Sequence, residues 1–224
     1  MAQIEARAGA GSGRSPHARR MLCDSITLEP QPMNLLAHLL LAENSDTSFA
    51  GQILGDEVKG RLDARFPPAI RRGIRLHRAI DTFSDAHAGH QRLRRLFEPP
   101  LRRYAGILVD IGLDRALTRQ WQAFHPLPLS VFAAHAQQQA IAEWPRAAPF
   151  DAARLQRLAD VLAGYSQPAG IQRALDSVAG RLRRDNPVAS AWPALAARAE
   201  AFDEELAPIM HTLQAVVSAR ADSA

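Results

Sequence analysis

The sequence predicts an all-α fold, a single helical domain of about seven to nine helices. Apolar residues recur at intervals of three and four along most of the chain after residue 33, which is the period of a helix with one buried face. Proline and glycine separate these stretches, whereas the alternating pattern of a strand is nearly absent and β-branched residues are sparse. With 224 residues, 47% of them hydrophobic, the chain is long enough to bury a substantial core.

The expected helices follow one another through most of the chain. The first is the short, strongly apolar segment 34–44, and the second runs from the capping residues 46–48 to Gly60, because glycine is typical just after a helix. The third begins near Pro67 and Pro68, since proline fits the first turn of a helix. The remaining helices are a shorter one through Leu93 and Phe97, then others at about 101–121, 128–143, 151–165, 168–184 and 190–215.

Residues 1–32 differ in composition from the rest of the chain. They are rich in glycine, alanine, serine and arginine, lack a sustained apolar period, and end on Pro30 and Pro32. We expect a disordered extension here, followed by the helical domain at 33–224, with Met33 as the natural start. The alternative is a basic arm that binds a partner of its own.

Two further features limit the class of protein. Cys23 is the only cysteine, which excludes a disulfide framework and a cysteine-based metal site. No apolar run approaches the length of about 18 residues that a membrane-spanning helix needs, and the N-terminus lacks the pattern of a secretory signal. We therefore expect a soluble, cytoplasmic protein without a membrane partner.

Histidine and aspartate recur beside the apolar faces of the expected helices. His77, Asp81 and Asp85 are spaced by four, so on a helix they lie along one face. The pair at Asp110 and Asp114 repeats this spacing in an apolar setting, where an unpaired carboxylate is costly to bury. Histidine and carboxylate ligands without cysteine suit Mn, Mg, Fe or Zn in hydrolytic enzymes. The candidate metal ligands are His38, Asp56, His77, Asp81, Asp85 and Asp110.

Each candidate also has an alternative, purely structural interpretation. His38 could be a core histidine bonded to a backbone carbonyl, and Asp81 or Asp85 could pair with Arg78 or Arg92. Asp114 could form a surface pair with Arg115 or Arg119. The remaining candidates, His125, His135 and His211, stand in weaker contexts and are expected to be surface or core residues.

The basic residues are almost all arginine and they cluster. Lys59 is the only lysine. Between positions 71 and 103 there are nine arginines and three acidic residues, so the net charge of this segment is +6 (nine minus three), which exceeds the net charge of +4 for the whole chain. This cluster is either a solvated helix face or a docking surface for a polyanion or an acidic protein. The aromatic content of 6% argues against nucleic acid. The expected docking residues are Arg71, Arg72, Arg75, Arg78, Arg94, Arg95, Arg102 and Arg103.

Five segments resemble one known family. They are "MNLLAHLLLA", "GQILGDEVKG", "PPAIRRGIRLHRAIDTFSDAH", "RRYAGILVDIGLDRAL" and "LAGYSQPAGIQRALDSVAGRL", which together span nearly all of 33–215. In this order they are similar to the acyl carrier protein (ACP) phosphodiesterases, also called ACP hydrolyases. The resemblance implies an all-helical fold related to the HD phosphohydrolases, a Mn2+ cofactor, and hydrolytic removal of 4′-phosphopantetheine from holo-ACP.

The resemblance also implies roles for individual residues. Asp56, His77, Asp81 and Asp110 would bind the metal or activate water, with His38 and Asp85 next to them. We expect Lys59 or His87 to assist by phosphate contact or proton transfer. ACP is a small acidic protein, so it is the expected partner of the arginine cluster.

Two positions depart from the family pattern. Leu40 and Arg115 stand where relatives usually carry histidine. Two alternatives therefore stay open beside the ACP phosphodiesterase. One is a phosphohydrolase acting on a nucleotide or another phosphodiester, and the other is a catalytically impaired, basic ACP-binding module.

Overall fold

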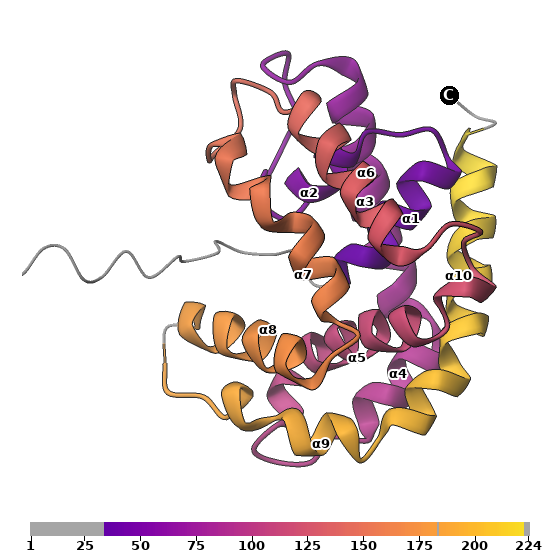
Figure 1. Cartoon of the computed structure of the whole chain (residues 1–224), viewed down its shortest axis with the longest axis vertical. Helices are drawn as coiled ribbons and strands as arrows, with labels where there is room; N and C mark the ends of the chain where they lie inside the picture. Colours follow the sequence, from indigo (N-terminus) through magenta and orange to yellow (C-terminus); the bar gives the residue numbers. More distant parts are fainter. Residues whose placement is uncertain (1–33, 183, 222–224) are drawn as a thin grey trace, which may run out of the picture.

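The computed structural model describes residues 34–182 and 184–221, and within them every regular element is a helix (Figure 1). The predicted all-α class is confirmed. Ten α-helices are present in this part of the chain rather than seven to nine, because two are very short. The expected extension at 1–32 and the expected start at Met33 lie outside the described residues.

The helices have the following bounds. They are α1 Leu35–Asn44, α2 Phe49–Leu54, α3 Pro68–Ala86, α4 Ala88–Arg95, α5 Ala105–Arg119, α6 Leu129–Ala142, α7 Leu158–Gly164, α8 Pro168–Arg181, α9 Trp192–Ala196 and α10 Ala199–Ala221. Short 3-10 turns lie at Arg102–Tyr104, Trp121–Ala123, Ala152–Arg157 and Val188–Ser190. Among the described helices, none combines the length and the apolar composition that crossing a membrane requires.

Three expected helices differ from the structure, and in place of the one at 151–165 a 3-10 turn at Ala152–Arg157 precedes the shorter α7. The helix expected to reach Gly60 ends at Leu54, and the chain then turns, with the carbonyls of Val58 and Gly60 accepting hydrogen bonds from the Arg78 side chain. Gly60 does have a positive φ of 76°, but in this loop and not at a helix end. The helix expected at 190–215 is divided into α9 and α10, where Arg198 donates to the carbonyls of Leu96 and Ala194.

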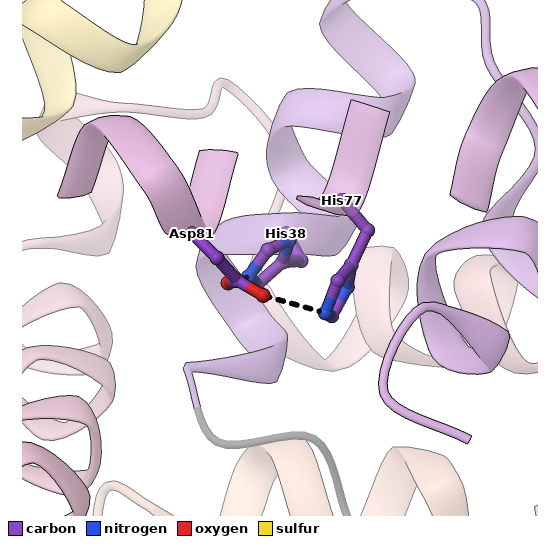
Figure 2. Close-up of side chains that lie close together, drawn as sticks. All are labelled: His38, His77 and Asp81. Atoms are coloured by element: carbon purple, nitrogen blue, oxygen red, sulfur yellow. Dashed lines mark hydrogen bonds and ion pairs between the residues drawn. The ribbon is translucent and has the colours of Figure 1, made fainter. Parts of the chain in front are cut away.

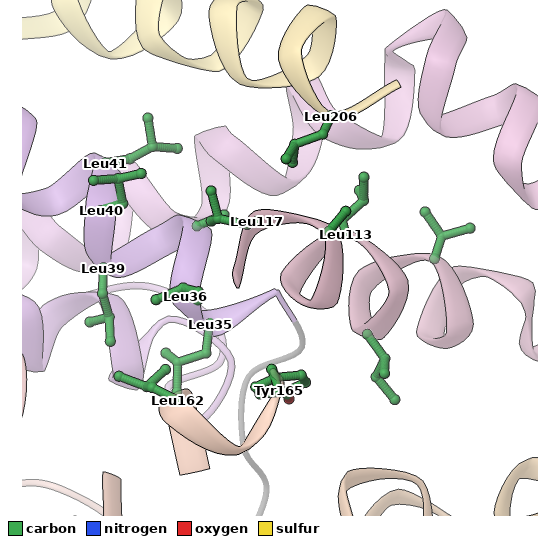
Figure 3. Packing of buried hydrophobic residues seen from close by; sticks show 14 of the residues in the cluster. Leu35, Leu36, Leu39, Leu40, Leu41, Leu113, Leu117, Leu162, Tyr165 and Leu206 are labelled. Carbon is green, nitrogen blue, oxygen red and sulfur yellow. The ribbon is translucent and has the colours of Figure 1, made fainter. Parts of the chain in front are cut away.

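Helix α1 forms the centre of the core. All residues from Leu35 to Ala42 are buried, and leucines point from it in several directions (Figure 3). Leucines of α5 and α10 cover one side, and Leu162 and Tyr165 cover another. A helix that is apolar all round is stable only when other helices enclose it. A histidine placed in this helix is therefore carried into the interior of the protein.

Helices α2 and α3 cross in close contact at two glycines. A Cβ atom on Gly51 would lie 2.8 Å from the Cα of Gly73, and a Cβ on Gly73 would lie 2.9 Å from the Cα of Gly51. Side chains at this crossing would force the two backbones apart. The crossing brings the end of α2 beside the middle of α3, where His77 and Asp81 lie.

Asp114 joins α5 to the start of α1. Its side chain is fully buried and accepts hydrogen bonds from the backbone N–H groups of Leu36 (3.1 Å) and Ala37 (3.3 Å). The N-terminal N–H groups of a helix have no partners within the helix, so this carboxylate satisfies two of them. The alternative of a surface pair with Arg115 or Arg119 was wrong, because Asp114 is a buried helix cap.

Candidate metal centre

His38, His77 and Asp81 converge from two helices (Figure 2). The Nε2 atom of His38, on α1, lies 3.1 Å from Oδ1 of Asp81, and Nε2 of His77 lies 3.1 Å from Oδ2 of the same carboxylate. His77 and Asp81 are one turn apart on α3, as their spacing predicted. In the described part of the chain this is the one group of three histidine, cysteine or acidic residues close enough together to hold a metal ion.

Asp56 is the fourth residue of this cluster. It follows α2, and its Oδ1 lies 3.4 Å from Nε2 of His77. The two histidine rings stack 4.1 Å apart and are buried, whereas the side chains of Asp56 and Asp81 are 38% and 47% exposed. The cluster therefore has a buried nitrogen side and a carboxylate side that is open to solvent. The structural alternatives were wrong here, because His38 contacts side chains and Arg78 binds the loop after α2.

Gln52 orients the ring of His38. Its Oε1 lies 3.1 Å from Nδ1 of His38, and since an amide oxygen only accepts, Nδ1 carries the proton and donates. Nε2 is then the nitrogen that is directed at Asp81 and available to a metal. Sequence reasoning missed Gln52, although a polar residue within the apolar segment "FAGQIL" was a signal for a buried hydrogen bond.

Gly55 makes room for the ring of His77. A Cβ atom at position 55 would overlap with that ring, although the backbone of Gly55 is ordinary right-handed helix (φ −56°, ψ −42°). The glycine is thus required by space and not by backbone conformation. It explains why glycine directly precedes Asp56 in this sequence.

The carboxylates and histidines strongly perturb one another. Burial acts to lower the pKa of His77, but the carboxylates of Asp56 and Asp81 outweigh it and raise that pKa to about 9. Burial acts to raise the pKa of Asp81 and of Asp56. The neighbouring His38 and His77 nevertheless hold the pKa of Asp81 well below its usual range, and His77 lowers the pKa of Asp56. The cluster concentrates negative charge around a site that attracts a cation.

The donor set fits a divalent metal ion. Both ring nitrogens of His77 are buried and form no hydrogen bond, although Nε2 faces two carboxylates. Adjacent ligands of an octahedral ion, each about 2.1 Å from it, lie about 3 Å from one another. The separations of 3.1, 3.1 and 3.4 Å match that spacing. His38, His77, Asp81 and Asp56 are therefore the residues that could hold a metal.

The other predicted ligands lie beside this centre. Asp110 contacts His90 at 3.3 Å, and the charge of Asp81 adds to burial in raising the pKa of Asp110. Asp85 is more exposed and pairs with Arg94 at 3.2 Å, not with Arg92 as one alternative had it. Sequence reasoning missed His90, because its buried environment is not evident from the polar segment around it.

The two predicted assisting residues have different surroundings. Nδ1 of His87 accepts a hydrogen bond from the N–H of Gly89 and so caps α4, which leaves its Nε2 as the second nitrogen. Lys59 is exposed in the loop whose carbonyls Arg78 binds.

The two departures from the family pattern face away from the cluster. Leu40 is fully buried in the main core. Two residues correspond to about 200° around a helix, so it points away from His38. Arg115 lies over the ring of Trp192, 5.6 Å from its centroid.

Comparison with known proteins shows the family of this chain. The family model described as acyl carrier protein phosphodiesterase matches residues 33–213. The chain belongs to the acyl carrier protein phosphodiesterase family. A relative of that name from Klebsiella pneumoniae (strain 342) is 35% identical over 163 residues, 71% of this chain and 84% of the relative. Another from Salmonella dublin is 34% identical over 179 residues, 77% of this chain and 91% of the relative. No solved structure matches the chain.

Proposed function

We propose that this protein is a metal-dependent ACP phosphodiesterase. It would hydrolyse the phosphodiester that joins 4′-phosphopantetheine to a serine of holo-ACP, releasing apo-ACP and 4′-phosphopantetheine in the cytoplasm. The observation that carries the proposal is the convergence of His38, His77, Asp81 and Asp56 in a member of this family. Leu40 and Arg115 do not weaken it, because neither position faces the cluster.

The residues divide the work between binding and orientation. His38 and His77 would bind Mn2+, the proposed ion, from the buried side, and Asp56 and Asp81 would bind it from the exposed side, with Asp110 at the edge. A bound divalent ion activates water and offsets the negative charge of the phosphate. Gln52 keeps Nε2 of His38 directed at the ion. Asp85 would act as an outer member of the set.

Lys59 and His87 remain the proposed assisting groups. Lys59 stands on the loop directly after Asp56, and Arg78 fixes that loop by binding its carbonyls. A flexible ammonium group there can reach a phosphate as it approaches the exposed carboxylates. His87 keeps Nε2 for proton transfer, since Nδ1 caps α4.

The arginine cluster is the proposed docking surface for ACP. Arg72, Arg75, Arg95, Arg102 and Arg103 are exposed, on α3, on α4 and on the turn before α5. Other members are partly buried, and Arg78 and Arg94 bind groups of this chain. The exposed members would attract an acidic carrier protein at long range, whereas Arg78 and Arg94 support the surface from within.

The direct test is incubation with holo-ACP and Mn2+, followed by mass spectrometry for loss of the phosphopantetheine arm. Asp81→Asn should lower kcat/KM by at least about 100-fold, because it removes a charged ligand from the centre. Asp176→Asn is the matched control, an exposed aspartate on α8 that should leave the rate unchanged. Circular dichroism should show the same helicity in both variants.

Three results would replace this proposal with an alternative. Binding of holo-ACP without cleavage, in protein loaded with Mn2+, would indicate an ACP-binding module. Cleavage of a simple phosphodiester or nucleotide but not of holo-ACP would indicate a different phosphohydrolase. Full activity of Asp81→Asn would remove this residue from the site.

A further inference from the structure

A buried histidine outside the metal centre lies between two carboxylates. His90, on α4, is 1% exposed. Its Nε2 lies 3.3 Å from Oδ1 of Asp110 on α5, and its Nδ1 lies 4.0 Å from Oδ1 of Asp85 on α3. One imidazole ring thus joins three helices at the side of the centre where Asp110 lies.

A second contact fixes the register of α4 against α5. Arg94 is one turn after His90, and Gly106 is one turn before Asp110. A Cβ atom on Gly106 would lie 2.6 Å from Nη2 of Arg94, so the guanidinium lies directly against the α5 backbone. The same Nη2 pairs with Asp85 at 3.2 Å. The antiparallel helices α4 and α5 therefore meet at two successive turns, His90 with Asp110 and Arg94 with Gly106. Asp85 of α3 lies against both His90 and Arg94.

This arrangement does not suit a second metal ion. The two carboxylates face different nitrogens of the His90 ring, and one ion can bind only one of those nitrogens. Asp85 is also already paired with Arg94. The ring is better placed to orient a carboxylate than to ligate an ion.

The carboxylate that it orients belongs to the proposed centre. Asp110 and Asp85 lie against the two sides of the His90 ring, and Asp85 is one turn after Asp81 on α3. Two carboxylates that face one ion repel each other before the ion binds, and a hydrogen bond can hold one of them in the binding position. We propose that His90 is a positioning residue that holds the Asp110 carboxylate toward the metal centre, with Asp85 and Arg94 supporting the ring from behind.

The inference rests on the proposed function, since it takes Asp110 as a ligand of the metal. Two amide variants separate orientation from mere packing. The amide of glutamine reaches the position of Nε2, so His90→Gln can still donate to Asp110, whereas the shorter His90→Asn cannot. We expect His90→Asn to bind Mn2+ about 10- to 100-fold more weakly than the parent and His90→Gln to stay within about threefold.

The experiment is a calorimetric titration of the full chain with Mn2+, with thermal unfolding in chelator to show that each variant folds. His125→Asn is the matched control, because His125 is also buried and pairs with a carboxylate, Glu43, at 2.8 Å. It should change stability but not Mn2+ affinity.

The outcomes are distinct. Equal affinities of His90→Asn and His90→Gln would overturn the positioning role while leaving the metal site intact. Two ions bound by the parent and one by His90→Asn would make His90 a ligand and also overturn it. A parent that binds no Mn2+ would overturn the proposed metal site and this inference together.

Discussion

At the scale of single residues, the geometry of the site depends on two residues beside the cluster, Gly55 and Gln52. His77 can face Asp56 and Asp81 because position 55 has no side chain. Gln52 has the complementary role, since it adds a polar atom in an apolar helix and thereby orients His38. Neither residue would bind a metal, yet both determine where the nitrogens of His38 and His77 point.

The role of Gly55 leads to a prediction about metal affinity. Gly55→Ala places a methyl group where the His77 ring lies, so the ring must move, and overpacking of this kind costs about 1–3 kcal/mol. We expect Mn2+ affinity, measured by titration, to fall more than about tenfold. Gly180→Ala is the control, because nothing surrounds that position and alanine should stabilise α8 by about 0.5–1 kcal/mol. Unchanged Mn2+ binding by Gly55→Ala would contradict this account.

At the residue scale, sequence reasoning recovered part of the site. His38, Asp56, His77 and Asp81 were all expected, and the structure brings them together. Gln52 and His90 were missed, because a hydrogen bond to a residue far along the chain leaves no periodic signal. Asp85 was expected on the same helix face as Asp81, but it pairs with Arg94 of α4. The spacing of residues along α3 cannot predict a contact with another helix.

At the scale of elements, α1 shows how a buried helix is fixed in place. Its leucines fill the core, and its first N–H groups bond to Asp114 of α5. Burial raises the pKa of Asp114 to about 7, although the bonds from Leu36 and Ala37 act to lower it. The cap therefore links the position of α1, and of His38 within it, to the protonation of Asp114 on α5.

This pKa predicts how stability depends on pH. The folded protein keeps the Asp114 proton up to about pH 7, whereas the unfolded chain releases it near 3.8, the ordinary pKa of an aspartate side chain. The contribution of this group to the free energy of unfolding is therefore present at low pH and is lost as pH rises from about 4 to 7. In urea unfolding with chelator, Asp114→Asn should gain stability relative to the parent over this interval. A difference that is constant with pH would contradict the shifted pKa.

Element boundaries show why local patterns are incomplete. The proline signals placed the start of α3 correctly, because proline acts through its own backbone. The end of α2 was misplaced, since the loop after it is shaped by Arg78, which is twenty residues from Val58 in sequence. For the same reason the sequence left open whether Asp114 forms a surface pair or is buried, because its partners lie 77 and 78 residues away.

At the scale of the whole molecule, charge is distributed unevenly. The segment with nine arginines between positions 71 and 103 also carries His77, Asp81 and Asp85. A basic surface around an acidic metal centre would attract an acidic protein and then present its phosphodiester to the cation. Proximity in sequence is sufficient to predict the charge excess, but the exposure of each arginine depends on its neighbours.

The proposed docking surface predicts a charge-dependent rate. Arg72→Glu with Arg75→Glu should lower kcat/KM for holo-ACP by at least about tenfold at low salt, through slower association. Arg146→Glu with Arg157→Glu is the control, an equal change of charge at exposed arginines outside the segment, with a smaller effect. The rate of the parent should also fall as salt rises. Equal effects of the two double variants, or a rate that does not depend on salt, would contradict a localised docking surface.

The sequence by itself determined the helical class, the core character of α1 and the shared face of His77 and Asp81. These follow from periodicity, which needs only the geometry of one helix. The tertiary structure decided which other residues complete the centre. His38, Gln52 and Asp56 reach the cluster from α1, from α2 and from the loop after it, where α2 and α3 cross closely at glycines. His90 contacts Asp110 beside the cluster because α4 lies in register on α5. Contacts between distant segments depend on how helices pack, which no local pattern encodes.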